Sequence, residues 1–376
     1  MNIKALYSLS LFLILTFSVS GAIPDGYYSS LDGLTTANLK TALHNIICRD
    51  TTHYLNYGSN TGHTWQGFYS TDRDPATNEV IDMYSDSARY FVSNYVAQGY
   101  PGFGMTIQIE HSVPKSWWGC DIDHPDCAAR DLNHLYPSDG KYNNYKSNNP
   151  LGVVTGTLAH TNGVSKIGTG TYAGYTGTVF EPADKYKGDF ARGYFYIATA
   201  YQHYINKWVL SAPGIMMEAD TYPTLKPWAI QLLLQWVRQD PVSLKELSRV
   251  ENVFAIQKNR NPFIDHPELI EYIWGNMKDS VYWLADHPSA TIPTGIAPPS
   301  AHKLSISPNP AKGQIHLGVD GETGNYQYTI YSITGSMVLS GNTSVSTINV
   351  SGLKSGMYLC EVKTLSEKLV GRLIIL

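Results

Sequence analysis

The feature that most constrains the fold of this chain is a segment rich in Pro, Ser and Thr, which runs from Pro288 to Ser300. This composition is typical of an extended linker. The chain has 376 residues, which is more than one compact core usually supports. We therefore expect two folded units, at residues 23–286 and 303–376, joined by a linker at residues 287–302.

The sequence after the linker differs in kind from the sequence before it. Polar and apolar residues alternate at Tyr326–Tyr331 and Met357–Val362, between turns at Asn309-Pro310, Thr334-Gly335 and Ser355-Gly356. This pattern predicts a small all-β unit. In the first unit, apolar residues recur at helical spacing near residues 31–46, 191–204, 225–238 and 241–259. We expect an α+β protein whose first unit is mainly helical.

The N-terminus has the layout of a secretory signal peptide. Lys4 supplies a positive charge, an apolar run extends from Ala5 to about Val19, and small residues lead to Ala22. A membrane anchor is the alternative, but the run is shorter than the roughly 20 apolar residues that span a bilayer. We expect residues 1–22 to be removed, and a secreted or cell-surface protein with no membrane span in the mature chain.

Export favours disulfide bonds, and the chain has four cysteines. Cys120 and Cys127 enclose a short polar loop, so we expect a local bridge between them. The alternative is a zinc site built from Cys120, His124 and Cys127, which lacks a fourth ligand and a recognised spacing. The pairing of Cys48 and Cys360 stays open. The net charge of −4 argues against electrostatic binding of nucleic acid by the protein surface as a whole. Phosphate must therefore be bound locally, by a few lysines, arginines and a bound cation.

The residues that carry candidate chemistry begin at Glu110. The segment Thr106–Glu110 alternates like a half-buried strand, and His111 follows it. Cleaving a phosphodiester without a covalent intermediate needs a base that deprotonates water and a cation on the scissile phosphate. An imidazole and a carboxylate stand side by side here. Successive strand residues face opposite ways, so Glu110 and His111 point apart unless the strand bends at its end.

A second polar region follows. The short element Asp131–Ser138 leads into the stretch Lys141–Asn148. If that stretch is helical, Asn143 and Asn144 point to different faces. A strand, a loop, a second strand and a helix that carries an oxygen ligand form the layout of a ββα-metal nuclease site.

Five segments occur in a fixed order: Ile109–Trp117, Asp131–Ser138, Asn143–Asn148, Ala191–Tyr196 and Gln257–Asp265. Together they resemble the bacterial endonuclease I family of periplasmic and extracellular nucleases. The resemblance implies a ββα-metal core in which His111 activates water, and Glu110 and Asn143 bind Mg²⁺, with Ca²⁺ and Mn²⁺ as alternatives. The implied substrates are DNA and also RNA. They would be cut with little sequence preference to give 5′-phosphate and 3′-hydroxyl ends.

Three further residues are candidates for phosphate binding. Lys146 stands where the family commonly has arginine, and a lysine holds phosphate only as a point charge. Arg192 offers a guanidinium fork, which could equally bridge buried carbonyls. His134 could contact phosphate, and a hydrogen-bonded structural role is at least as well supported.

Several neighbouring residues have competing interpretations. Asn144 and other asparagines near Asn143 could cap the helix or shape a turn. Trp117 and Trp118 could stack on bases, but core packing is the better interpretation. Arg260 lies between two asparagines in what we interpret as a structural loop.

The C-terminal unit carries a second resemblance. Its segments Leu304–Ala311, Ile333–Val338 and Leu353–Leu359 are similar to the C-terminal sorting domain that the type IX secretion system recognises. This implies a secretion machinery as partner, and removal or surface attachment of the tail. The alternative is a β-sandwich that binds carbohydrate or protein.

Two functions follow for the whole chain. The first is a secreted, metal-dependent endonuclease. The second is a surface-displayed protein that binds nucleic acid or adheres. In this interpretation two departures from the pattern of the family have weakened catalysis: Gln108-Ile109, where an Asn-Arg pair commonly precedes Glu-His, and Lys146 in place of arginine. A metalloprotease is excluded, because the sequence has no His-Glu-x-x-His segment.

Overall fold

The structure is a computed structural model, which describes residues 23–49, 51–74, 77–100, 107–118, 128–212, 214–290, 304–319, 326–333, 335–343, 347–363 and 368–376. The predicted signal peptide at residues 1–22 lies outside the described residues, and so does most of the predicted linker. Within the described part, no helix has the length and apolar character that a membrane crossing requires.

The first unit combines helices with small antiparallel sheets. Its helices are α1 (Thr36–Ile47), α2 (Thr64–Thr71), α3 (Gly140–Lys146), α4 (Lys187–Ala200), α5 (Pro227–Gln239), α6 (Leu244–Gln257), α7 (Pro262–Asp265) and α8 (Leu269–Ile273). Its strands are β1 (Phe91–Ser93), β2 (Val96–Ala97), β3 (Ile107–His111), β4 (Leu135–Asp139), β5 (Leu158–Thr161), β6 (Lys166–Tyr172) and β7 (Tyr175–Glu181). Short 3₁₀ turns complete it: η1 (Ser29–Leu31), η2 (Lys115–Trp117), η3 (Ala128–Arg130), η4 (Asp184–Tyr186) and η5 (Leu284–Asp286).

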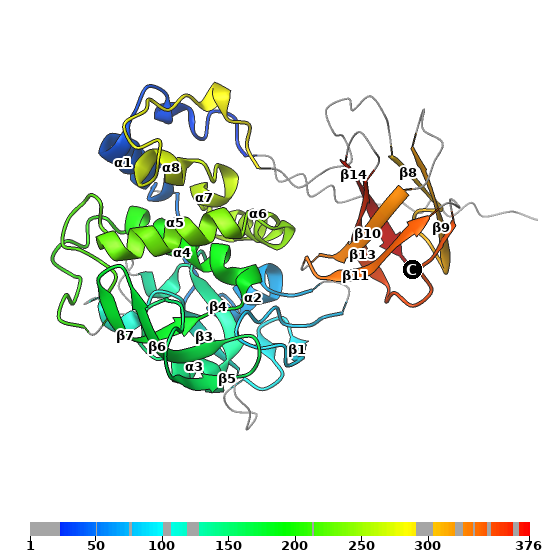
Figure 1. Ribbon diagram of the computed structural model, residues 1–376, viewed down its shortest axis with the longest axis horizontal. Coiled ribbons are helices and arrows are strands. Elements are labelled where there is room, and N and C mark those ends of the chain that lie inside the picture. The colour runs from blue at the N-terminus through cyan, green and yellow to red at the C-terminus, as the bar shows by residue number, and fades with distance from the viewer. Residues whose placement is uncertain are drawn as a thin grey trace, which may run out of the picture.

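Helix α4 forms the centre of this unit. All of its residues are buried, as expected for a helix with apolar residues on every side. Figure 1 shows α4, α5 and α6 across the middle, with β3 to β7 on one side and α1 and α8 on the other. The helix begins at Lys187, before the predicted stretch, and Gly188 allows this start. A Cβ at Gly188 would clash with the carbonyl oxygen of Asp240.

Helices α5 and α6 agree with the predicted helical stretches, and local signals explain where they start. Pro227 occupies the first turn of α5, where no amide donor is needed. At α6, the Ser243 side chain accepts from the Glu246 amide while the Glu246 side chain accepts from the Ser243 amide. This capping box satisfies two amides that a helix start otherwise leaves without partners.

The predicted strand–strand–helix order is present in the first unit. Strand β3 pairs antiparallel with β4, in a register that sets Ile107 opposite Asp139 and His111 opposite Leu135. Helix α3 follows β4 directly, because the Asp139 carboxylate accepts from the amides of Lys141 and Tyr142 and caps the helix. The chain therefore holds one face of α3 against β3, which is where Asn143 and Lys146 lie.

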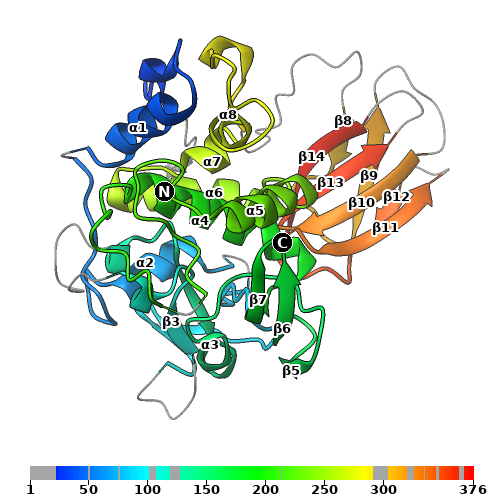
Figure 2. The ribbon, with the colours of Figure 1, turned by 60° about the vertical axis from the view of Figure 1, so that its left-hand side comes forward.

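The second unit is all β. Its strands are β8 (Leu304–Ser307), β9 (Gln314–Val319), β10 (Tyr326–Ser332), β11 (Met337–Thr343), β12 (Thr347–Asn349), β13 (Gly356–Lys363) and β14 (Lys368–Ile375). They form one sheet in the order β11-β10-β13-β14 and another in the order β12-β9-β8 (Figure 2). Its buried apolar side chains form a cluster of their own. The prediction of an α+β protein with a small C-terminal β domain is confirmed.

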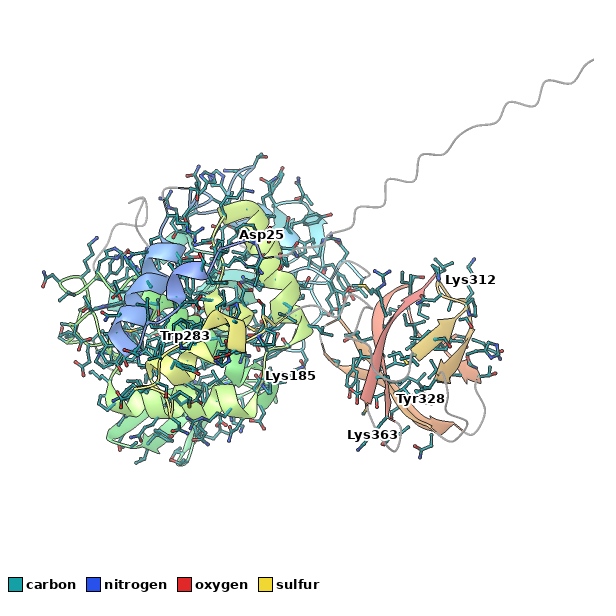
Figure 3. The ribbon with its side chains drawn as sticks, turned by 90° about the horizontal axis from the view of Figure 1, so that it is seen from above. Asp25, Lys185, Trp283, Lys312, Tyr328 and Lys363 are labelled. Atoms are coloured by element: carbon teal, nitrogen blue, oxygen red, sulfur yellow. The ribbon has the colours of Figure 1, made fainter. Side chains whose placement is uncertain are left out.

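The side chains gather in two groups that follow this division. Figure 3 shows Asp25, Lys185 and Trp283 in the first unit, and Lys312, Tyr328 and Lys363 in the second. The apolar clusters of the first unit contain residues between Ile23 and Ala290, and the cluster of the second contains residues from Leu304 to Ile375. Each unit thus has its own core.

Candidate active site

Glu110 is a buried carboxylate at the end of β3, with 4% of its surface exposed. Its Oε1 accepts a hydrogen bond of 2.8 Å from the Tyr84 hydroxyl. The same oxygen lies 2.7 Å from Nζ of Lys146, which comes from α3. This ammonium group is fully buried and is not aligned for a hydrogen bond with any described residue. The contact is therefore an ion pair, and it balances the charge of the carboxylate.

Asn143 lies on the same face of α3 as Lys146, three residues earlier. Its Nδ2 donates to Oε1 of Gln108 across 3.2 Å. Gln108 shares a face of β3 with Glu110, because the two are separated by two residues in a strand. The bond turns the amide nitrogen of Asn143 towards Gln108, so that Oδ1 is its remaining group for a cation.

His111 is 9% exposed, and among the described residues its ring makes one polar contact. Its Nε2 lies 3.2 Å from the carbonyl oxygen of Ala129, in η3. Since a carbonyl only accepts, Nε2 carries the hydrogen, and in the neutral ring Nδ1 bears the lone pair. Burial lowers the pKa of His111 to about 3, and the neighbouring His134 adds to this effect. The ring is therefore neutral at ordinary pH, which is the form a general base requires.

Aromatic rings surround His111. Tyr57 stacks on it with centroids 5.7 Å apart and planes at 17°, and Trp118 meets it edge-on at 6.0 Å. His134 lies 5.9 Å away with no surface exposed, and its Nε2 is 2.7 Å from the carbonyl oxygen of Ala128. Burial lowers the pKa of His134 to about 4. The contacts of His134 with described residues all lie in the interior.

Glu110 and His111 face different surroundings, as expected for neighbours in a strand. Glu110 meets Tyr84 and Lys146, whereas His111 meets η3 and the aromatic rings. The structure thus brings Glu110, Gln108 and the α3 residues together, and places the imidazole beside that group. The charge of Lys146 acts on both parts, because it also contributes to lowering the pKa of His111.

The turn that holds both imidazoles is fixed by the buried carboxylate of Asp131. Its Oδ2 accepts from the hydroxyls of Tyr196 and Tyr201, at 2.7 and 3.0 Å. Its Oδ1 accepts from Nε2 of Gln257 at 2.9 Å and from the amide of Asn133 at 3.0 Å. Donors from α4, α6 and the turn itself converge on one side chain. The Ala128 and Ala129 carbonyls are therefore held in place by a network that sequence alone does not reveal.

Arg192 and Arg260, the two arginines considered in the sequence analysis, are paired with carboxylates in the interior. Arg192 is 1% exposed and donates to both oxygens of Glu246, at 2.5 and 2.8 Å. Its Nη1 donates to the carbonyl oxygen of Asp240. These contacts occupy the guanidinium fork of Arg192 with protein acceptors. Arg260 pairs with Glu251 and Asp265 in the same manner, in agreement with the structural role expected for it.

The remaining candidates divide into packed residues and residues that the structure does not describe. Trp117 and Trp118 are 0% and 4% exposed and belong to the main apolar cluster, as expected. Cys120 and Cys127, with the predicted bridge and the alternative zinc site, lie outside the described residues.

Tyr84 is the contact of Glu110 that the sequence analysis missed. It lies in an irregular segment with no motif, 26 residues before Glu110, and no local pattern indicates the pairing. The position of Gln108 could have been predicted from the sequence. Residues two positions apart in a strand point to the same face, so Gln108 lies on the same face of β3 as Glu110.

Comparison with known proteins identifies the family to which each unit is similar. Residues 35–268 match the family Endonuclease I, and residues 305–376 match the secretion system C-terminal sorting domain. An extracellular ribonuclease of Bacillus amyloliquefaciens is 32% identical over 252 residues, which cover 66% of this chain and 78% of the relative. An extracellular ribonuclease of Bacillus subtilis (strain 168) is 32% identical over 254 residues, with the same coverage.

Among solved structures, dimeric latent PorU of Porphyromonas gingivalis matches 24% of this chain and 10% of its own, at 21% identity and a TM-score of 0.15. That likeness is too low to support any conclusion. The two family matches confirm both resemblances seen in the sequence. The sorting domain marks the protein as secreted or displayed at the cell surface. The chain belongs to the endonuclease I family and is a nuclease that hydrolyses nucleic acid.

Proposed function

We propose that this nuclease is a divalent-metal-dependent endonuclease that hydrolyses phosphodiester bonds of both DNA and RNA with little sequence preference. In this proposal His111 is the general base, and Glu110 and Asn143 hold Mg²⁺ or a similar hard cation. One observation supports it above all: β3, β4 and α3 form a ββα unit in which Glu110 and Asn143 lie on facing surfaces. The names of the two Bacillus relatives support RNA as a substrate beside DNA.

The donor set fits a hard cation. One carboxylate and one amide oxygen suit Mg²⁺, which keeps several of its waters and takes few protein ligands. Among the described residues, no group of three or more His, Cys, Asp or Glu side chains is arranged to hold a metal. When bound, the cation would neutralise charge on the scissile phosphate and on the departing 3′ oxygen.

In the proposed reaction, His111 acts as the general base. His111 takes a proton from the attacking water through Nδ1, while Nε2 keeps its hydrogen bond to the Ala129 carbonyl. The water oxygen bonds to phosphorus, the bond from phosphorus to the 3′ oxygen breaks, and that oxygen takes up a proton from solvent. The products carry 5′-phosphate and 3′-hydroxyl ends. His111 returns to its neutral form by losing the proton to solvent, which its lowered pKa favours.

A second candidate function is supported by one contact. Lys146 already neutralises Glu110, and a site with that pairing would bind nucleic acid and cut it only slowly. The full chain would then be a catalytically weak, surface-displayed protein that binds nucleic acid or adheres. Retardation of DNA with only slow nicking at millimolar Mg²⁺ would support this alternative.

The decisive experiment compares the full-length protein with His111→Ala on supercoiled plasmid and on RNA, with and without a chelator. We expect the substitution to lower the rate by about 10²- to 10⁴-fold, because it removes the general base. His316→Ala is the matched control, since it removes an exposed imidazole from the C-terminal unit. Circular dichroism checks folding, and ligation of the products without a kinase checks for 5′-phosphates. Full activity of His111→Ala, or undiminished activity in the chelator, contradicts the proposal.

A further inference from the structure

One hydrogen bond and one ion pair converge on a single oxygen of Glu110. The Tyr84 hydroxyl donates to Oε1 across 2.8 Å, and Nζ of Lys146 lies 2.7 Å from the same atom. Among the described residues, Oε2 has neither a hydrogen-bond partner nor an ion-pair partner. Within this part of the chain the carboxylate is held through one oxygen, which leaves the other oxygen for a cation.

The ring of Tyr84 is held rigidly enough to determine where that carboxylate points. Tyr84 is completely buried. Its ring stacks on Phe180 of β7 with centroids 4.9 Å apart and planes at 20°, and meets Phe190 of α4 edge-on at 5.8 Å. Packing against two elements holds the hydroxyl beside Glu110.

The backbone of Tyr84 is fixed as well. Its carbonyl oxygen accepts from Nδ2 of Asn162 and from the hydroxyl of Ser165, both at 2.9 Å. Its amide donates to Oδ1 of Asp82 at 2.7 Å, and Oδ2 of Asp82 accepts from the amide of Asp139 at 3.0 Å. Asp139 caps α3, so one carboxylate ties the Tyr84 segment to the helix that carries Asn143. The two proposed ligands are thus supported from one connected framework.

We propose that Tyr84 is a positioning residue for the cation site: together with Lys146 it holds Oε1 of Glu110, so that Glu110 binds the cation through Oε2 alone. This inference rests on the proposed function, because it requires a cation at Glu110. Partners that orient a ligating carboxylate typically change metal affinity by about 10- to 100-fold when they are lost. Tyr84 touches neither substrate nor reacting atoms, so its loss acts on the binding of metal.

The test is Tyr84→Phe in the full-length protein, which keeps the ring and removes only the hydroxyl. Mn²⁺ is the probe, titrated calorimetrically without nucleic acid. We expect the dissociation constant for Mn²⁺ to rise about 10-fold or more. Because a weakly folded variant would confuse the titration, the rise in Tm at saturating Mn²⁺ is measured in parallel.

Tyr28→Phe is the matched control. Tyr28 is 2% exposed, and its hydroxyl donates to Oδ2 of Asp265 at 2.6 Å, so this variant also loses a buried bond between tyrosine and carboxylate. We expect it to lose similar stability and to bind Mn²⁺ like the native protein. An equal loss of affinity in Tyr28→Phe and Tyr84→Phe would mean a general effect of stability and would overturn the positioning role.

Glu110→Ala separates this inference from the proposed function. If Glu110→Ala abolishes Mn²⁺ binding while Tyr84→Phe binds normally, the cation site stands and the role of Tyr84 is wrong. If Glu110→Ala binds Mn²⁺ as well as the native protein, the proposed cation site itself is wrong, and the role of Tyr84 falls with it.

Discussion

Two lysines of the first unit have no surface exposed to solvent, and they are stabilised in different ways. Nζ of Lys146 lies against the carboxylate of Glu110. Nζ of Lys40 instead donates to neutral acceptors, Oε1 of Gln202 at 2.9 Å and the carbonyl oxygen of Thr221 at 2.7 Å. A buried charge with a counter-charge and a buried amine with neutral partners respond differently to substitution and to pH.

Replacing Lys146 by Met should destabilise the protein in the presence of a chelator. Glu110 would stay buried with only the Tyr84 hydroxyl, and breaking a buried ion pair on one side costs about 3 kcal/mol or more. The free energy of unfolding in urea measures this loss. Lys141→Met, in the exposed part of the same helix, should change it little. The double variant Glu110→Gln with Lys146→Met should recover most of the loss, and a simple sum of the two single effects would contradict the pairing.

Lys40 should make the stability of the protein depend on pH above neutrality. Burial lowers its pKa to about 7, although Asp220 opposes the shift. Between about pH 7 and the ordinary lysine pKa, the unfolded chain binds more protons than the folded one, so the free energy of unfolding rises with pH. The slope is at most about 1.4 kcal/mol per pH unit. Urea unfolding of the native protein and of Lys40→Met is measured at pH 7, 8 and 9. The free energy of unfolding of the native protein should rise with pH relative to that of the variant. A constant difference would refute this.

At the scale of elements, the sequence predicts what depends on neighbours in the chain. The strand before Glu110, the second strand and the helix with Asn143 are local, and the capping carboxylate of Asp139 stands directly before α3. The predicted helices near α4, α5 and α6 are present, within a few residues at their ends. Alternation also located the C-terminal strands, because one face of each sheet packs on its own core.

Contacts between distant segments could not be predicted in this way. The Tyr84 hydroxyl reaches Glu110 across 26 residues, and Arg192 finds Glu246 across 54. From the sequence, the guanidinium of Arg192 beside a nuclease motif suggests phosphate binding. Only the folded structure, in which α4 packs against the start of α6, shows that this guanidinium is paired with the carboxylate of Glu246. The face of α3 is an intermediate case: helical spacing separates Asn143 from Asn144, but Gln108 decides which of them faces β3.

At the scale of the whole molecule, the two units have separate apolar cores. The cluster of the C-terminal unit includes Ile315, Ile330, Val362 and Leu373, and it shares no buried apolar residue with the clusters of the nuclease unit. The β unit therefore adds no buried apolar residue to the core around β3, β4 and α3. Its match to a sorting domain instead indicates a role in secretion.

A chain that ends at residue 290 should therefore fold and keep the nuclease activity of the full-length protein to within about a factor of two, because no core residue of the first unit is lost. Calorimetry of the full-length protein should show two unfolding transitions, and the truncated chain should retain the one that belongs to the nuclease unit. A truncated chain that unfolds at a much lower temperature would contradict the independence of the two cores.

Strand β5 has a consequence for how molecules of this protein meet one another. It forms the edge of the sheet β5-β6-β7, and all four of its residues are exposed. An open edge invites pairing with a strand from another molecule, which would lead to aggregation. The register shift between Leu158 and His160 interrupts the regular row of donors and acceptors, and the strand is short. An irregularity of one residue thus helps a nuclease released from the cell to stay dispersed.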